Sequence, residues 1–250
     1  MALSEHLSFV LCVALATFAQ NTTGFAFGLL LLGLTGMLGI ASVETIANVS
    51  SLLTLANAMV LVRRWPDFSP RLLALVLGCS LFGVVIGVAL LTVLGAHERM
   101  LLQLLLGATI VVCSLLLVAR THARERVSSW WSFSCFAGLS GVMGGLFSSA
   151  GPPLVYQLYR QPLSVKVVRD TLILVFAVNA LARLGVVAAT QQFEQQAAYL
   201  ALEALPVVFG LTWFMRRNPP SISPRLLRWT VFVLLLLSGA SLLIRAASRL

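Results

Sequence analysis

The chain has 250 residues, of which 59% are hydrophobic and only 10% are charged. A soluble domain of this length carries about a quarter charged residues, so this chain cannot cover a water-exposed globule with charge. The formal net charge of +9 does not indicate nucleic-acid binding, because the basic residues fall in short segments between apolar runs, where membrane proteins collect cytoplasmic Lys and Arg. Composition therefore predicts a multi-pass protein of the lipid bilayer with no nucleic-acid partner.

Five uncharged stretches are candidate membrane spans, since a span takes about 18 mainly apolar residues. They exclude a single signal peptide, which has one short apolar core followed by a soluble remainder. The stretches cover residues 7–43, 72–97, 100–119, 127–159 and 229–244.

The first apolar run predicts a broken element rather than one helix. Polar residues at 20–24 interrupt the run at 7–40, and a helix ending at this interruption would rise only about 21 Å, less than the ~30 Å hydrocarbon core. Asn21, Thr22 and Thr23 are good N-caps for a second helix that follows. Such a break survives at membrane depth only where it is packed in protein or lines a wet cavity.

A second broken element is predicted at residues 131–159, with its interruption at 148–153. The interruption ends in Gly151, Pro152 and Pro153, and proline is favoured at the first helical position, so a short helix is expected at about 154–159. Continuous helices are predicted at residues 44–62, 72–94, 100–119, 170–189, 197–215 and 229–247.

The basic residues distinguish two ways of threading these elements through the membrane. If every apolar run crossed once, Lys and Arg would divide evenly, with eight on each face. If residues 131–159 enter and return on the same side, thirteen lie on one face and three on the other. The positive-inside rule favours the second arrangement. It predicts cytoplasmic segments at 63–71, 120–126, 160–169 and 216–228.

The two halves of the chain carry a weak internal repeat. A shift of 122 residues aligns residues 42–58 with 164–180, gives five identities and matches Asn57 with Asn179. A hairpin plus three crossings leaves the chain on the opposite face, so the second repeat is predicted to be inverted. The predicted fold is an all-α polytopic membrane protein of two inverted-topology repeats, each a re-entrant helix hairpin plus three transmembrane helices. The predicted repeats are residues 1–120 and 131–250, joined by a cytoplasmic linker at 121–130.

The two interruptions together predict an anion site near the middle of the membrane. In inverted repeats the two helix starts converge, and each carries unpaired N–H groups and roughly half a positive charge. Such starts bind anions without a buried Lys or Arg. Helix packing by small residues is the alternative for the interruptions, and hydrogen bonding between helices is the alternative for the two asparagines. The candidate substrate-binding residues are Gln20, Asn21, Thr22, Thr23, Gly24, Ser148, Ser149, Gly151, Asn57 and Asn179.

Three ionisable residues are candidates for coupling or access. Arg183 and Glu203 lie well inside predicted spans, where ionisable groups are functional candidates; the alternative is that the two pair with each other. Asp170 lies at a predicted helix start, where capping is the alternative to proton transfer. No metal site or cofactor is expected, because the three histidines lie in predicted loops or at the terminus and no C-x-x-C pair occurs.

Three segments resemble motifs of the sulfite exporter TauE/SafE family. Residues 18–28 (FAQNTTGFAFG) resemble its first-repeat motif, residues 138–153 (GLSGVMGGLFSSAGPP) its second-repeat motif, and residues 238–243 (SGASLL) its last helix. The second motif departs from the family's denser glycine run at residues 148–150. The resemblance covers the whole chain and implies transport of sulfur-containing anions such as sulfite and organosulfonates, by export or by import.

The sequence therefore predicts a secondary transporter of the inner (plasma) membrane, most simply an exporter, for a small sulfur-containing anion, with protons as a candidate coupling ion. The alternatives are an importer or channel for another small anion, and a membrane accessory or assembly protein without transport. An intramembrane enzyme is not expected, because no nucleophile–base pair or metal cluster lies inside the predicted spans. The sequence indicates no oligomeric state.

Overall fold

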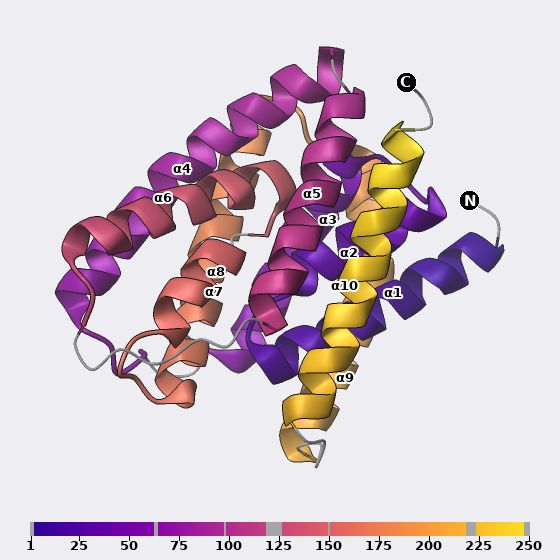
Figure 1. The fold of residues 1–250 in the computed structure, drawn as a ribbon. Helices are drawn as coiled ribbons and strands as arrows, with labels where there is room; N and C mark the ends of the chain where they lie inside the picture. The colour runs from indigo at the N-terminus through magenta and orange to yellow at the C-terminus, as the bar shows by residue number, and fades with distance from the viewer. Residues whose placement is uncertain are drawn as a thin grey trace.

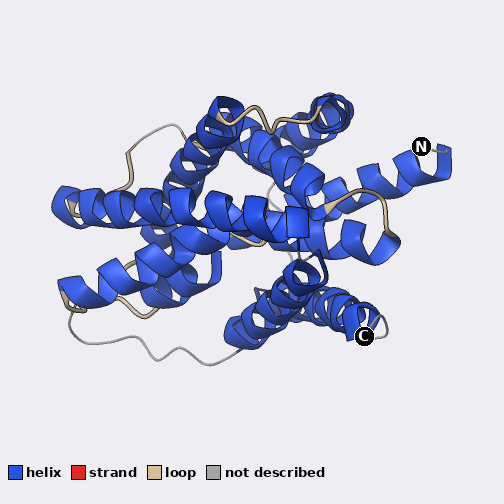
Figure 2. Cartoon of the chain, turned by 90° about the horizontal axis from the view of Figure 1, so that it is seen from above, coloured by secondary structure: helices blue, strands red, loops and turns tan. Residues whose placement is uncertain are grey.

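A computed structural model describes residues 3–62, 65–97, 99–118, 127–149, 151–218 and 224–247. Within these residues every regular element is a helix (Figure 2). The helices are α1 (Leu3–Thr23), α2 (Phe27–Leu38), α3 (Val43–Leu61), α4 (Pro70–His97), α5 (Arg99–Val118), α6 (Trp130–Phe147), α7 (Gly151–Tyr159), α8 (Val165–Ala189), α9 (Gln195–Arg217) and α10 (Pro224–Ala247).

The predicted continuous helices are confirmed as α3, α4, α5, α8, α9 and α10. Helix α8 begins five residues before its predicted start at residue 170, because the side chain of Ser164 caps it by accepting a hydrogen bond from the Val167 N–H at 3.3 Å. Six helices in the described part of the chain are long and apolar enough to cross a membrane, namely α1, α3, α4, α8, α9 and α10.

The first interruption is confirmed, but it lies at residues 24–26, and the predicted N-caps are wrong. Residues 20–23 form the last turn of α1, where the hydroxyls of Thr22 and Thr23 donate to backbone carbonyls four residues earlier, each at 2.7 Å. These bonds satisfy the hydroxyls within the helix, so the 21 residues of α1 rise about 31 Å rather than 21 Å. The chain turns at Gly24 (φ 82°) and Ala26 (φ 81°), where the left-handed backbone ends any helix.

The second interruption separates α6 from α7 at the predicted place. Ser148 adopts a left-handed backbone (φ 50°) after α6, and α7 begins at Gly151, three residues before its predicted start. Pro152 and Pro153 therefore occupy the second and third positions of α7, where their missing N–H groups break no helical hydrogen bond.

Helices α6 and α7 fold back on each other. The backbone N–H of Ser128, just before α6, donates to Oε1 of Gln161, just after α7, at 2.9 Å. The Gln161 amide in turn donates to the Ser128 hydroxyl at 2.9 Å. The outer ends of the α6–α7 pair therefore lie side by side, as expected for a hairpin. Most of the predicted linker at 121–130 lies outside the described residues.

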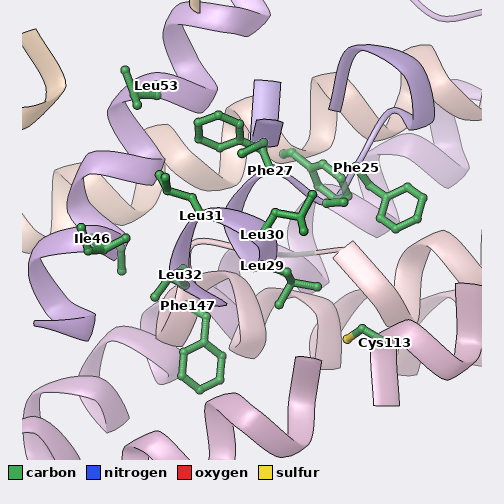
Figure 3. Close-up of a cluster of buried hydrophobic side chains, with 14 of the residues drawn as sticks. Phe25, Phe27, Leu29, Leu30, Leu31, Leu32, Ile46, Leu53, Cys113 and Phe147 are labelled. Atoms are coloured by element: carbon green, nitrogen blue, oxygen red, sulfur yellow. The ribbon is translucent and has the colours of Figure 1, made fainter. Parts of the chain in front are cut away.

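The other helices pack around α2 and α7, the short helices that follow the two interruptions. Helix α4 runs along α6, α5 runs along α10, and α3 packs against both α8 and α9 (Figure 1). Residues 27–33 of α2 are buried on every side, and Figure 3 shows its leucine side chains pointing in several directions into the protein. A helix that is apolar all round belongs in an interior. The start of α2 is therefore enclosed by protein.

Candidate functional site

The two interruptions lie against each other. A Cβ atom built on Gly28, in the first turn of α2, would lie 2.6 Å from the Ser148 carbonyl oxygen and 3.0 Å from the Ser149 Cβ. Only glycine therefore allows this close approach. Beside the contact is a narrow pocket with about 250 Å³ of empty space, its open mouth included. The pocket is lined by Gln20, Phe25, Ala26, Phe27, Gly28, Thr54, Ser148, Ser149, Gly151 and Phe176.

The pocket receives the starts of both α2 and α7. In α2, no side chain caps the first turn, and the first internal bond runs from the Leu30 N–H to the Ala26 carbonyl at 2.9 Å. The N–H groups of residues 27–29 therefore have no acceptor within the helix. In α7, two of the first three residues are prolines, so only Gly151 carries an N–H there. Helix α2 thus brings more free backbone donors to the pocket than α7.

Four of the ten candidate binding residues line this pocket, namely Gln20, Ser148, Ser149 and Gly151. The other six, which are Asn21, Thr22, Thr23, Gly24, Asn57 and Asn179, are not among its lining residues. Sequence reasoning missed Thr54 of α3 and the rings of Phe25 and Phe176, which also line it. One local signal existed, because Asn48, Ser51, Thr54 and Asn57 recur every third residue along the predicted helix.

Asn57 is the centre of a hydrogen-bond network that joins three helices. It is fully buried, and its amide nitrogen donates to Oε1 of Gln20 and to Oδ1 of Asn21, both at 3.0 Å. Its carbonyl oxygen accepts from the Thr212 hydroxyl at 2.7 Å, and the Asn21 amide donates to the same hydroxyl at 2.9 Å. The alternative of interhelical bonding thus describes Asn57, which together with Asn21 connects α1, α3 and α9.

Asn179 makes the corresponding bond between α8 and α4. Its carbonyl oxygen accepts from the Ser80 hydroxyl at 2.9 Å. Its amide nitrogen is buried and has no hydrogen-bond partner. The carbonyl oxygen of this amide therefore joins α8 to α4, and its NH₂ group makes no hydrogen bond.

The predicted pairing of Arg183 with Glu203 is wrong. The guanidinium of Arg183 donates to the Gly145 carbonyl at 2.9 Å, to Oδ1 of Asn48 at 2.7 Å and to the Ser51 hydroxyl at 3.2 Å. Glu203 instead lies 2.8 Å from Nδ1 of His6 in α1. The two side chains therefore contact different helices: Arg183 of α8 contacts α3 and α6, whereas Glu203 of α9 contacts α1.

The predicted cap role of Asp170 is also wrong, because α8 begins at Val165 and Ser164 caps it. Its neighbour Arg169 reaches the first interruption, where its guanidinium donates to the backbone carbonyl of Asn21 in the last turn of α1. A cation is favourable at this position, since a helix C-terminus carries partial negative charge. In the described part of the chain, no group of His, Cys, Asp and Glu side chains could hold a metal ion.

Long apolar helices around a narrow pocket, built where two helices are interrupted, are the layout of multi-pass membrane transporters. The chain belongs to the sulfite exporter TauE/SafE family, whose model matches residues 9–242. The resemblance found in the sequence motifs is thereby confirmed.

Two curated relatives carry transporter names. The chain is 37% identical over 233 residues to the probable sulfite/organosulfonate exporter TauE of Cupriavidus necator, covering 93% of this chain and 91% of that protein. It is 27% identical over 168 residues to the probable inner membrane transporter protein TsaS of Comamonas testosteroni, covering 66% of this chain and 70% of that protein. No solved structure matches.

Proposed function

We propose that this protein is a secondary transporter that exports a small sulfur-containing anion, such as sulfite or an organosulfonate, across the inner membrane. The observation that carries the proposal is the meeting of two helix starts at one pocket. The N–H groups at the start of α2 and the N–H of Gly151 are the donors for the anion, and the Ser149 and Thr54 hydroxyls add polar contacts. Helix starts of this kind are suited to anions. The name of the Cupriavidus relative supports export of this substrate class.

We further propose that residues 1–120 and 131–250 form two inverted repeats. The Thr212 hydroxyl bonds Asn57 between α9 and α3, and the Ser80 hydroxyl bonds Asn179 between α4 and α8. If α1, α3 and α4 of the first half correspond to α6, α8 and α9 of the second, these two bonds correspond to each other. The packing of α1 on α9 then corresponds to the packing of α6 on α4. Related halves on either side of a central site are the layout of many secondary transporters.

Substitutions in the pocket test the binding site. Thr54→Val and Ser149→Ala each remove one hydroxyl from the lining and should weaken sulfite binding about tenfold, the usual loss for a hydrogen bond to a charged group. Thr22→Val is the matched control, because the Thr22 hydroxyl already bonds the carbonyls of Phe18 and Ala19 in its own helix. Calorimetric titration of the purified protein measures the affinities. Equal affinities in the parent, both pocket variants and the control would refute this site.

Transport assays separate the carrier from its alternatives. Proteoliposomes loaded with sulfite should show saturable efflux that responds to an imposed pH gradient if protons are coupled. Flux that rises linearly with concentration would indicate a channel, and accumulation in the opposite direction would indicate an importer. A purified protein that binds the anion in its pocket yet moves none would be an accessory or assembly protein.

A further inference from the structure

Arg183 is fully buried in the C-terminal half of α8, and its hydrogen-bond partners are all neutral groups. It has no solvent exposure and is the largest of the completely buried side chains. Its three hydrogen bonds go to a backbone carbonyl of α6 and to Asn48 and Ser51 of α3. These acceptors orient the guanidinium but do not neutralise it.

No described carboxylate serves as the counter-ion of Arg183. Glu203 is paired with His6 and not with Arg183. Glu194 accepts a hydrogen bond from Thr45 near the start of α3 and forms no ion pair with the guanidinium. A buried charge without a counter-ion is costly, and in membrane proteins such groups mark substrate or ion pathways. A bound anion would remove this cost.

Two buried donors on one face of α8 have no acceptor. Nη2 of Arg183 and the amide nitrogen of Asn179 are both buried without a hydrogen-bond partner. Residues four apart are neighbours on a helix surface, so these donors lie on the same stretch of α8. Unpaired buried donors are rare in folded proteins, and what this pair lacks is an acceptor.

The same stretch of α8 leads to the pocket. Phe176 lies one turn before Asn179 and lines the pocket. Two hydroxyl groups also connect the guanidinium of Arg183 to the pocket. Nη1 of Arg183 donates to the Ser51 hydroxyl at 3.2 Å. The Ser51 hydroxyl lies 2.7 Å from the hydroxyl of Ser148, and Ser148 lines the pocket. The guanidinium is therefore adjacent to the pocket but separate from its lining.

We propose that Arg183 and Asn179 form a second anion-binding site, next to the pocket on the side of the start of α3. Its ligand is the oxyanion group of sulfite or of a sulfonate, because Nη2 of the charged guanidinium still has N–H groups to donate to such an oxyanion, and the Asn179 amide supplies a further donor. The inference rests on the proposed transport function. The anion passes from the helix starts, which offer only partial charges, to a full positive charge that has no competing carboxylate.

Two substitutions test this second site in the purified full-length chain. Arg183→Gln removes the charge and keeps a hydrogen-bond donor. Asn179→Asp keeps the oxygen that accepts from Ser80 and places a permanent carboxylate beside the guanidinium. Both should weaken sulfite and methanesulfonate binding by about tenfold or more, while Arg183→Lys, which keeps the charge, should retain part of the affinity. Arg216→Gln is the control for loss of one exposed positive charge.

Thermal unfolding distinguishes a binding role from a purely structural one. In a buffer whose only anion is gluconate, Arg183→Gln and Asn179→Asp should unfold at or above the parent temperature, because each relieves an uncompensated charge. The rise in unfolding temperature that sulfite gives the parent should disappear in both. If Arg183→Gln fails to fold, Asn179→Asp alone decides the question.

The outcomes separate this inference from the proposed function. If both variants bind sulfite with parental affinity while Ser149→Ala binds weakly, the second site is wrong and the pocket stands. If the parent binds no sulfite, or if Ser149→Ala and Thr54→Val bind it as the parent does, the proposed function fails and this inference fails with it.

Discussion

Asn57 shows how buried polar side chains in this chain hold helices together. Its amide bonds Gln20, Asn21 and Thr212, so one side chain connects α3 with α1 and α9. Gln20 belongs to this network and to the pocket lining. The network therefore fixes the last turn of α1 beside the pocket, which makes Asn57 a positioning residue for the site.

Asn57→Ala is expected to lower the free energy of unfolding by about 2 kcal/mol, because three hydrogen bonds between membrane helices are worth roughly 0.6 kcal/mol each. Reversible unfolding in mixed micelles measures the loss. Ser134→Ala is the control, since this exposed hydroxyl bonds only a carbonyl of its own helix and its removal should change little. A loss no greater than that of the control would show that the Asn57 network does not stabilise the fold.

Local sequence could predict the residues of the interruptions but not the hydrogen-bond partners of Arg183. Ser148, Ser149 and Gly151 were expected in the site because they stand inside an apolar run, and they line the pocket. Arg183 has partners 132, 135 and 38 residues away along the chain. No periodicity encodes such contacts, so its pairing with Glu203 was predicted wrongly.

At the scale of elements, the packing of α4 against α6 depends on facing glycines. A Cβ atom on Gly141 would lie 2.0 Å from the Ser80 carbonyl oxygen, and one on Gly87 would lie 2.2 Å from the Val142 carbonyl oxygen. No side chain fits at these distances, so the two backbones touch directly. Small residues at interfaces are the usual route to such close packing in membranes.

Gly141→Ala should therefore lower the free energy of unfolding by about 1–3 kcal/mol, the usual cost of overpacking, and the yield of monodisperse protein should fall. Gly78→Ala and Gly185→Ala are matched controls, because no atom lies within 4 Å of a Cβ atom at either position. Both controls should be neutral or slightly stabilising, since alanine favours the helix. Equal behaviour of all three variants in thermal unfolding would contradict the close packing.

The interruptions were predictable as elements, but their boundaries were not. Polar residues inside an apolar run indicated a break, yet threonine hydroxyls that bond their own helix let α1 continue to Thr23. The turn then uses Gly24 and the left-handed backbone of Ala26. Alanine rarely adopts that conformation, so nothing in its identity marks it as the residue before a helix.

At the scale of the whole molecule, the α6–α7 hairpin bears on how the chain is threaded through the membrane. The hydrogen bonds between Ser128 and Gln161 bring the ends of the α6–α7 pair together. This agrees with the arrangement in which residues 131–159 enter and return on one face. That arrangement also places thirteen basic residues on the cytoplasmic side.

Labelling of single cysteines tests this topology in a variant that lacks the four native cysteines. Arg124→Cys and Pro162→Cys should both react with a membrane-impermeant maleimide from the cytoplasmic face. Gln191→Cys, at the exposed turn between α8 and α9, should react from the opposite face. Reaction of positions 124 and 162 from different faces would contradict the hairpin and support single crossings.

The central claim is that an anion binds where the starts of α2 and α7 meet. Its most direct test is a crystal structure of the full chain with selenite, a heavier analogue of sulfite whose selenium is located by anomalous scattering. We expect an anomalous peak in the pocket, within hydrogen-bond distance of backbone N–H groups at the start of α2 and of Gly151. A fully occupied selenite elsewhere, with this pocket empty, would contradict it.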